Sequence, residues 1–275
     1  MSTIFDLFDL TGRVAIVTGG AGLLGREFCK TLAEAGASVL VADLDGDAAA
    51  AVADSLTRAG YRTQSRPTDV TSEDSVKEMV SAALEAFGRL DILVNSAALD
   101  PKVEQDSLTP NSLSPAFEDY PLALWQRALE VNLTGAMLCC QAALRPMLAQ
   151  GSGVIINIAS IYGITPPDQR LYQREGQPPQ YKPAYYTVTK AGLLGLTRYL
   201  AACYGEKGIR VNALTPGGVF NSHDDEFVRR YSARAILGRM AEKDEMNGAL
   251  LFLASDASRY MTGANLVVDG GWTVW

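Results

Sequence analysis

The chain has 275 residues, 48% of them apolar, and no Pro/Ser-rich linker or charge run divides it, so the sequence predicts a single domain spanning 1–275. A formal net charge of −7 and a pI near 4.9 argue against nucleic acid or an anionic membrane as partners, because both would be repelled. The N-terminus lacks a basic segment followed by a long apolar run, so we expect a cytoplasmic protein that binds small molecules.

Short Val- and Ile-rich runs alternate with longer amphipathic segments along the chain. In chain order the runs are 14–20, 38–43, 91–97, 153–160, 209–214 and 265–269. The segments between them, among them 27–36, 46–56 and 75–88, have the periodicity and the terminal glycines of helices. Strands that are apolar on both faces and are separated by helices predict a parallel sheet covered on both sides. The predicted fold is therefore an α/β Rossmann fold with a doubly wound, mostly seven-stranded sheet and ligands at the carboxyl ends of its strands.

The first apolar run leads into a helix through the glycine-rich stretch "TGGAGLLG" at 18–25. Its glycines Gly19, Gly22 and Gly25 permit a tight turn and let backbone amides approach a pyrophosphate at the positive end of the helix. Asp43 ends the second run, where a carboxylate accepts both ribose hydroxyls of an adenosine and repels a 2′-phosphate. Because Leu44 and the glycines supply no compensating charge, NAD is predicted in preference to NADP. A purely structural turn is the alternative.

The stretch "YKPAYYTVTK" at 181–190 combines three tyrosines with a lysine. Residues four apart share a helix face, so Tyr186 and Lys190 point into one cleft, whereas Tyr185 turns toward a neighbouring face. An ammonium roughly 5 Å from a phenol supplies about 3 kcal/mol at a dielectric near 20, which is expected to lower the pKa of Tyr186. Such a phenol can exchange a carbinol proton while a nicotinamide exchanges the hydride. Ser160, at a strand end, can donate to the substrate oxygen.

From end to end, the chain resembles the short-chain dehydrogenase/reductases. The resemblance rests on "TGGAGLLG" at 18–25, "TDV" at 68–70, "NSAA" at 95–98, "VN" at 131–132, "NIAS" at 157–160, Tyr186 with Lys190, "NALTPGG" at 212–218 and "VVDGG" at 267–271. Leu23 departs from the glycine that most members carry, and Ser96 departs from their second asparagine. Gly22 gives a TGxxGxxG spacing that is more typical of the sugar-nucleotide-modifying branch.

The resemblance implies a cofactor site and a catalytic set. The implied NAD-binding residues are Gly19, Gly22, Leu23, Leu24, Gly25, Asp43, Leu44, Asp69, Val70, Asn95, Ser96, Ala97, Tyr186, Lys190, Pro216, Gly217 and Val219. Among them, Asp69 and Val70 would hold the adenine, Asn95 and Ala97 would line the cleft, and 216–219 would cradle the carboxamide. The implied catalytic residues are Asn132, Ser160, Tyr186 and Lys190, with Asn132 supporting a proton relay. From composition alone, Asn132 could equally begin a helix.

Three segments near the predicted cleft are candidates for substrate binding: insertions around 99–121 and 163–182 and a loop around 219–240. Their polar and aromatic content favours a sugar or polyol over a long acyl chain or a steroid. The candidate contacts are Tyr162, Tyr181, Tyr185, Arg170, Asn221 and His223. Arg170 and Arg174 would bind a phosphate or carboxylate if their stretch is helical. A solvated loop or a subunit contact is the alternative.

The predicted function is an NAD-dependent oxidoreductase that interconverts a secondary alcohol and a ketone. Over about forty residues, the chain is also similar to bacterial surface-sugar, flagellin-modifying and gluconate or polyol dehydrogenases. A 3-oxoacyl-type or other small ketone reductase, a dehydratase or epimerase, and a non-catalytic NAD-sensing protein stay open. A serine hydrolase is disfavoured because His223 is the only histidine and no GxSxG surrounds Ser160.

The cysteines, two predicted helices and two tryptophans lead to further predictions. Four cysteines without CxxC spacing predict reduced thiols and no metal site. The segments beginning at Trp125 and Tyr186 resemble helices that pair across subunits, which predicts a homotetramer, with a dimer second. Trp272 and Trp275 are expected to pack against another subunit or over the active site.

Overall fold

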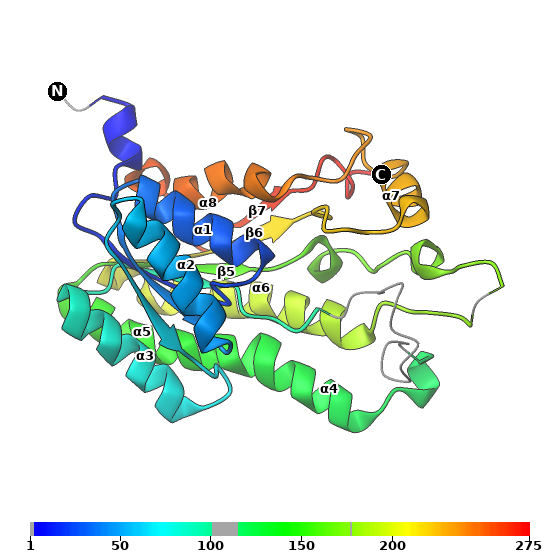
Figure 1. Ribbon diagram of the computed structural model, residues 1–275, viewed down its shortest axis with the longest axis horizontal. Coiled ribbons are helices and arrows are strands. Elements are labelled where there is room, and N and C mark those ends of the chain that lie inside the picture. The colour runs from blue at the N-terminus through cyan, green and yellow to red at the C-terminus, as the bar shows by residue number, and fades with distance from the viewer. Residues whose placement is uncertain (1–2, 101–114, 177) are drawn as a thin grey trace.

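The described residues form one parallel β-sheet with helices on both of its faces (Figure 1). The computed structural model describes residues 3–100, 115–176 and 178–275. The seven strands in those ranges are β1 (Val14–Thr18), β2 (Ser38–Asp43), β3 (Thr63–Pro67), β4 (Ile92–Asn95), β5 (Gly153–Ile158), β6 (Ile209–Pro216) and β7 (Asn265–Val268). Their order is β3-β2-β1-β4-β5-β6-β7, and every neighbouring pair is parallel. The predicted Rossmann fold is confirmed.

The order of the strands in the sheet reverses at β1. Strand β2 and then β3 lie on one side of β1, and β4 to β7 lie on the other side. Thr18 at the end of β1 is in register with Asn95 at the end of β4. The loops that follow these two strands therefore leave the sheet side by side. In a doubly wound sheet, this is the point at which a ligand-binding crevice forms.

One strand lies where the apolar pattern predicts none. Strand β3 has the sequence "TQSRP", and only Thr63 in it is buried. It forms the edge of the sheet and pairs with β2 alone. An edge strand is largely solvated and tolerates a terminal Pro67, so it needs no apolar run.

Eight α-helices in the described ranges connect the strands (Figure 1). They are α1 (Leu23–Glu34), α2 (Gly46–Arg58), α3 (Glu73–Phe87), α4 (Leu122–Leu129), α5 (Gly135–Gln150), α6 (Ala184–Tyr204), α7 (Asp225–Ser232) and α8 (Asn247–Ala254). Helices α1, α2 and α8 cover one face of the sheet, with Phe28 and Leu250 in its core. Helices α3, α5 and α6 cover the other face, where Met79 and Cys139 pack. Helix α7 lies beyond the carboxyl ends of the strands.

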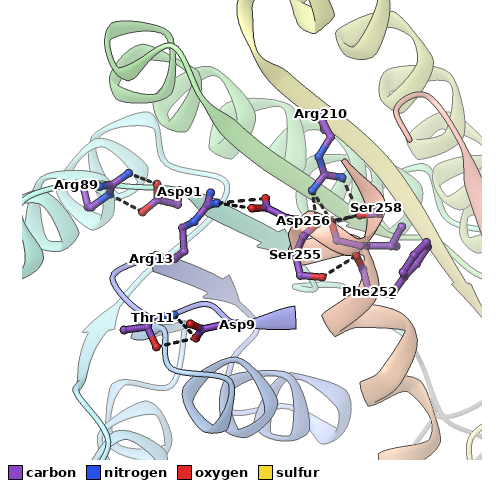
Figure 2. A network of polar contacts seen from close by, with 11 residues as sticks. Asp9, Thr11, Arg13, Arg89, Asp91, Arg210, Phe252, Ser255, Asp256 and Ser258 are labelled. Carbon is purple, nitrogen blue, oxygen red and sulfur yellow. Dashed lines mark hydrogen bonds and ion pairs between the residues drawn. The ribbon is translucent and has the colours of Figure 1, made fainter. Parts of the chain in front are cut away.

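Polar contacts fix the amino-terminal edge of the sheet (Figure 2). Asp91, only 1% exposed, accepts hydrogen bonds from the Arg89 guanidinium at 2.7 and 2.8 Å and from the N–H of Val14 at 2.9 Å. Arg210 donates to the carbonyl of Ser255 and the hydroxyl of Ser258, both at 2.9 Å, and thereby ties the end of α8 to β6. Charge-assisted bonds of this kind are strong when they are partly buried. They hold the edge of the sheet that lies opposite the carboxyl ends of the strands.

The structure also bears on the predicted reduced thiols and on whether a helix could cross a membrane. All four cysteines are unpaired, and Cys29, Cys139 and Cys140 are buried. Among the helices within the described ranges, none combines the length and the apolar character that crossing a bilayer requires.

Candidate active site

Two neighbouring cavities lie at the carboxyl edge of the sheet. The outer cavity, of about 470 Å³, lies beside the end of β2. The inner cavity, of about 420 Å³, lies over the ends of β5 and β6. Gly19, Gly22, Ser96 and Ala98 line both cavities, which places them end to end. Such a pair of chambers fits an elongated ligand that lies across the crevice beside β1.

The loop between the two cavities depends on two glycines. Gly19 has a φ of +64°, and a Cβ added to it would lie 2.8 Å from the Cα of Ala97. A Cβ on Gly25 would lie 2.0 Å from the carbonyl oxygen of Gly19, so the helix and the loop touch through bare backbone. Gly22 precedes α1 and offers its first turn no side-chain cap. The N–H groups of that turn and the positive end of the helix therefore remain for a pyrophosphate, which fits a dinucleotide cofactor.

Asp43 shapes the outer cavity. Its carboxylate accepts the N–H of Ala21 at 2.9 Å and the N–H of Asp45 at 3.1 Å, which fixes it beside the glycine loop. Arg26 and Arg127, which the sequence did not single out, also line this cavity. Predicted cofactor residues that line it are Gly19, Gly22, Asp43, Leu44, Asp69, Val70, Ser96 and Ala97. The outer cavity therefore has a carboxylate beside the glycine loop, at the end of β2.

Asn95 is the one predicted cofactor residue that neither cavity includes. Its side-chain amide donates to Asn157 Oδ1 at 2.9 Å and to Cys140 Sγ at 3.2 Å. Because Asn95 and Asn157 are in register on β4 and β5, the two amides bond to each other inside the protein. The side chain of Asn95 therefore ties two central strands together, and the expectation that Asn95 lines the cofactor cleft stays a prediction.

Tyr186, Lys190 and Ser160 meet in the inner cavity. Helix α6 begins directly after Pro183, so Tyr186 and Lys190 lie one turn apart near its start. Lys190 is 4% exposed, lies 5.7 Å from the centre of the Tyr186 ring, and donates to the carbonyl of Ile158 at 2.7 Å. Ser160 follows β5, and its hydroxyl accepts the N–H of Tyr162 at 3.2 Å. A phenol, an ammonium and a hydroxyl thus converge on one space.

The protein environment sets the protonation of this group. Burial raises the pKa of Tyr186 well above its ordinary value, the charge of Asp100 acts in the same direction, and the hydroxyl of Ser160 opposes them. Burial also lowers the pKa of Lys190 to about 8. Desolvation is the largest cause of the raised pKa of Tyr186, and its direction is opposite to the lowering expected from Lys190.

Asn132 lies within a helix and does not begin one. The π-helical turn Glu130–Thr134 joins α4 to α5, so the alternative of a helix start is wrong. Asn132 is 1% exposed, and its amide accepts the N–H of Leu99 at 2.6 Å and donates to the carbonyl of Leu99 at 3.0 Å. It also donates to Thr189 Oγ1 at 3.4 Å. A π turn frequently marks a functional position, and here it anchors the chain that leaves β4.

The candidate substrate contacts divide into two groups. Tyr162, Asn221 and His223 line the inner cavity. Tyr181 and Tyr185 do not line either of the two cavities, and neither does Arg170. The ring of Tyr185 is 4% exposed and packs 6.1 Å from that of Tyr120, because its position on α6 faces away from the cavity. Substrate contact by these three residues stays a prediction that the two cavity walls do not support.

The two arginines of the 163–182 insertion are paired within the protein. Arg170 lies in a short 3-10 turn, not an α-helix, and forms an ion pair with Asp168 at 2.8 Å. Arg174 pairs with Asp224 at 2.6 Å, just before α7. Because Arg170 bonds locally and Arg174 bonds across loops, the expected anion site at these positions is wrong. The Arg174–Asp224 pair fastens the insertion to the segment that precedes α7.

Several cavity residues were not predicted from the sequence. An aromatic column runs from Trp272 through Tyr231 and Phe227 to His223, with neighbouring ring centres 4.9 to 5.9 Å apart. Phe227 and Tyr231 are four apart on α7, so their shared face was readable from helical periodicity. Trp272 packs within the chain against Tyr162 and Tyr231 of the inner cavity wall, and Trp275, 74% exposed, donates a hydrogen bond to the carbonyl of Arg234. Lys182 and Asp100 also line the inner cavity, and no sequence pattern pointed to them.

Over nearly its whole length the chain is similar to known proteins. The family model described as enoyl-(acyl carrier protein) reductase matches residues 20–273. The cis-4-hydroxycyclohexanecarboxylate dehydrogenase of Sinomonas cyclohexanicum is 38% identical over 266 residues, which cover 95% of this chain and 96% of that protein. A short-chain dehydrogenase/reductase structure from Mycobacterium marinum has a TM-score of 0.85 and 34% identity, with 99% of each chain covered. The gluconate 5-dehydrogenase of Burkholderia cenocepacia J2315, solved with NADP and tartrate, has a TM-score of 0.82 and 31% identity, with 99% of this chain and 100% of that chain covered.

The fold and the glycine loop define a dinucleotide-binding protein of the oxidoreductase class. On the matches over nearly its whole length, the chain belongs to the short-chain dehydrogenase/reductase family, whose members bind a nicotinamide cofactor.

Proposed function

We propose that the protein is an NAD-dependent dehydrogenase that interconverts a secondary alcohol and a ketone on a hydroxylated small molecule such as a sugar, a polyol or a ring hydroxy acid. The observation that carries this proposal is the convergence of Tyr186, Lys190 and Ser160 at the end of the crevice that begins with the glycine loop. The proposed roles follow from what each side chain touches.

In the proposed reaction, the Tyr186 hydroxyl exchanges a proton with the substrate oxygen. Ser160 donates a hydrogen bond to that oxygen and holds it against the phenol. Lys190, which donates to the carbonyl of Ile158, is assigned to binding the nicotinamide ribose, and its buried position beside Tyr186 supports this role. Bound NAD supplies the hydride acceptor and, in its oxidised form, a positive charge that favours the phenolate. We assign Asn132 to support of the proton relay, at the π turn beside Thr189.

For the cofactor, the proposed residues are those of the two cavity walls. The first turn of α1 would hold the pyrophosphate, Asp43 the ribose hydroxyls, Asp69 and Val70 the adenine, and 216–219 the carboxamide. The charge on Asp43 supports NAD over NADP. A related gluconate 5-dehydrogenase was solved with NADP. The preference for NAD is therefore not taken from that relative and rests on Asp43 of this chain.

Asp43→Asn is expected to shift the kcat/KM ratio of NADP to NAD about 10²-fold toward NADP. Two negative charges roughly 5 Å apart at a dielectric near 20 repel by about 3 kcal/mol, and the substitution removes that repulsion while Arg26 stays in the cavity wall. The amide oxygen of asparagine can still accept the N–H of Ala21. Steady-state kinetics with both cofactors measure the shift, and Asp47→Asn, outside both cavity walls on α2, is the control. An unchanged ratio would contradict the role of Asp43.

Substrate class is supported by the lining of the inner cavity. It presents Tyr162, Asn221 and His223 together with the stacked rings of α7, a mixture of hydrogen-bonding groups and flat surface that suits a hydroxylated ring. The test is a spectrophotometric screen at 340 nm, with NAD or NADP against sugars, polyols and ring hydroxy acids, and with NADH or NADPH against 3-oxoacyl thioesters. Turnover of only the thioesters would favour the ketone-reductase alternative, and cofactor binding without turnover of any compound would favour an NAD sensor.

We also propose a homotetramer, or failing that a dimer. Large apolar side chains are exposed on α4 and α6, among them Leu122 at 67%, Leu124 at 53% and Tyr199 at 67%. Exposed apolar side chains gathered on neighbouring helices are typical of contact surfaces. Sedimentation velocity at micromolar concentration is expected to show a tetramer, and a monomer there would contradict the proposal.

A further inference from the structure

Lys182 places a second ammonium against the proposed catalytic tyrosine. Its Nζ lies 4.4 Å from the centre of the Tyr186 ring, and its side chain is only 10% exposed. It lines the inner cavity together with Lys190. Lys182 precedes the first residue of α6, so the loop, and not helical spacing, brings it to this position.

The backbone of Lys182 is held from both sides by one amide. Gln169 Oε1 accepts the N–H of Lys182 at 2.8 Å, and Gln169 Nε2 donates to the carbonyl of Lys182 at 3.0 Å. The insertion that carries Gln169 is in turn fastened near α7 by the Arg174–Asp224 ion pair, whose side chains are 12% and 10% exposed. The backbone at Lys182 is therefore held in place by two anchored segments. The backbone of a lysine on a free surface loop has no such support.

The charges around the inner cavity are few. Among its described lining residues, the lysines and carboxylates are Lys182, Lys190 and Asp100, and no arginine is included. Lys190 donates a hydrogen bond to the carbonyl of Ile158, and its proposed role is to bind the nicotinamide ribose. Lys182 pairs with Asp100, whose side chain is 49% exposed, and an ammonium has three N–H donors. This cavity thus has more lysines than carboxylates, in a chain that carries a net charge of −7.

We propose that Lys182 binds the carboxylate of a hydroxy-acid substrate, and that Asp100 is an internal carboxylate that competes for the same ammonium. This inference rests on the proposed function and narrows its substrate class. One ammonium matches one carboxylate, whereas a phosphate dianion is usually held by several donors or an arginine fork. Because the ammonium lies on the face of the Tyr186 ring, the acid group and the reacting carbinol belong to one small molecule.

A different role for Lys182 would leave a different signature. If the ammonium served to tune the proton affinity of Tyr186, its loss would shift the pH profile of turnover equally for charged and neutral substrates. If the Lys182–Asp100 pair served only to hold the loop, removal of either partner would change kinetics in the same direction. Substrate binding at Lys182 instead predicts that the two substitutions act in opposite directions, and only on acids.

The test compares 4-hydroxycyclohexanecarboxylate with its neutral carboxamide as substrates, with NAD. For Lys182→Met, KM for the carboxylate is expected to rise about 10- to 100-fold more than KM for the carboxamide, as for the loss of a hydrogen bond between charged groups. For Asp100→Asn, KM for the carboxylate is expected to fall while KM for the carboxamide changes less. Lys207→Met is the matched control, because Lys207 lies 5.4 Å from the Tyr204 ring beyond the other end of α6 and outside the inner cavity wall.

A binding measurement separates this inference from the proposed function. Cyclohexanecarboxylate and cyclohexanecarboxamide have no carbinol, so titration calorimetry of the NAD-saturated protein reports the lysine site without chemistry. Tighter binding of the acid that disappears in Lys182→Met supports the inference even if the screen finds no turnover. Equal binding of acid and amide by the unaltered protein, equal effects of Lys182→Met on both, or parallel effects of Lys182→Met and Asp100→Asn would each overturn it, with the proposed function unaffected.

Discussion

Tyr186→Phe is expected to lower kcat/KM for alcohol oxidation about 10³-fold, within the range that general acid–base catalysis contributes. The substitution removes only the hydroxyl that exchanges the substrate proton and leaves the ring, which packs against Tyr162 with 6.4 Å between ring centres. The Kd for NAD is therefore expected to stay within about threefold, so the loss lies in the chemical step. Steady-state kinetics and a cofactor titration on the same preparation measure both quantities.

The control for this prediction is the neighbouring tyrosine. Tyr185→Phe removes the same hydroxyl group from the preceding residue of α6. The ring of Tyr185 packs on Tyr120 outside both cavities. We expect its kcat/KM to stay within about threefold of the unaltered enzyme. If Tyr186→Phe retains turnover within about tenfold, or if the Tyr185 variant loses more activity than the Tyr186 variant, the assignment of the acid/base is wrong.

Gly25→Ala is expected to weaken NAD binding at least about 10²-fold, a loss of about 2.7 kcal/mol or more. The new Cβ would lie 2.0 Å from the carbonyl oxygen of Gly19 and 2.8 Å from the Cα of Gly20, so α1 must move away from the loop. That movement displaces the N–H groups proposed to hold the pyrophosphate. Titration calorimetry measures the affinity, and circular dichroism on the same sample establishes whether the variant is folded.

A second glycine provides the matched control. Gly248 lies in α8, and a Cβ there would meet no atom within 4 Å. Gly248→Ala is therefore expected to bind NAD normally and to gain about 0.5–1 kcal/mol in the free energy of unfolding. A folded Gly25→Ala protein that binds NAD within about threefold of the unaltered chain would show that the close contact at Gly19 does not shape the cofactor site.

The sequence predicted every strand of the sheet except one edge strand. Five strands were readable because a parallel strand buried on both faces is continuously apolar, as "VAIVT" at 14–18 and "GVIINI" at 153–158 show. Strand β7, at the other edge, was readable from its apolar sequence "NLVV". Strand β3 was not, because its sequence "TQSRP" lies at the solvated edge of the sheet. The fold class follows from the buried strands. Because β3 lies at the edge of the sheet, the failure to predict it did not change the predicted position of the crevice.

The candidate site was predictable where periodicity or a local turn determines it. The four-residue spacing of Tyr186 and Lys190 brings both to the inner cavity, and the same argument directed Tyr185 away from it. The glycine loop and Asp43 also lie together, as their places after β1 and β2 require. Each of these inferences needs only the geometry of one helix or of adjacent parallel strands.

The rest depends on contacts between distant segments. Arg174 is taken up by Asp224, and the side chain of Asn95 is turned inward by Asn157, a residue far along the chain. Lys182 reaches the cavity through its bonds to Gln169. The raised pKa of Tyr186 likewise comes from burial within the assembled site. No spacing in the sequence encodes these pairings, and the expected insertion around 99–121 lies partly outside the described residues, at 101–114.

The most direct test of the central claim is isotope transfer from a substrate found in the 340 nm screen, with deuterium on the carbinol carbon. In the proposed reaction the C–D bond of the carbinol breaks, bound NAD would accept the deuteride, and the phenolate form of Tyr186 would accept the hydroxyl proton. We therefore predict one deuterium in the reduced cofactor per ketone formed, by mass spectrometry, and no detectable transfer above background with Tyr186→Phe on the same timescale. Ketone formation with deuterium released to water, or deuterated cofactor at an undiminished rate in that variant, would contradict the account.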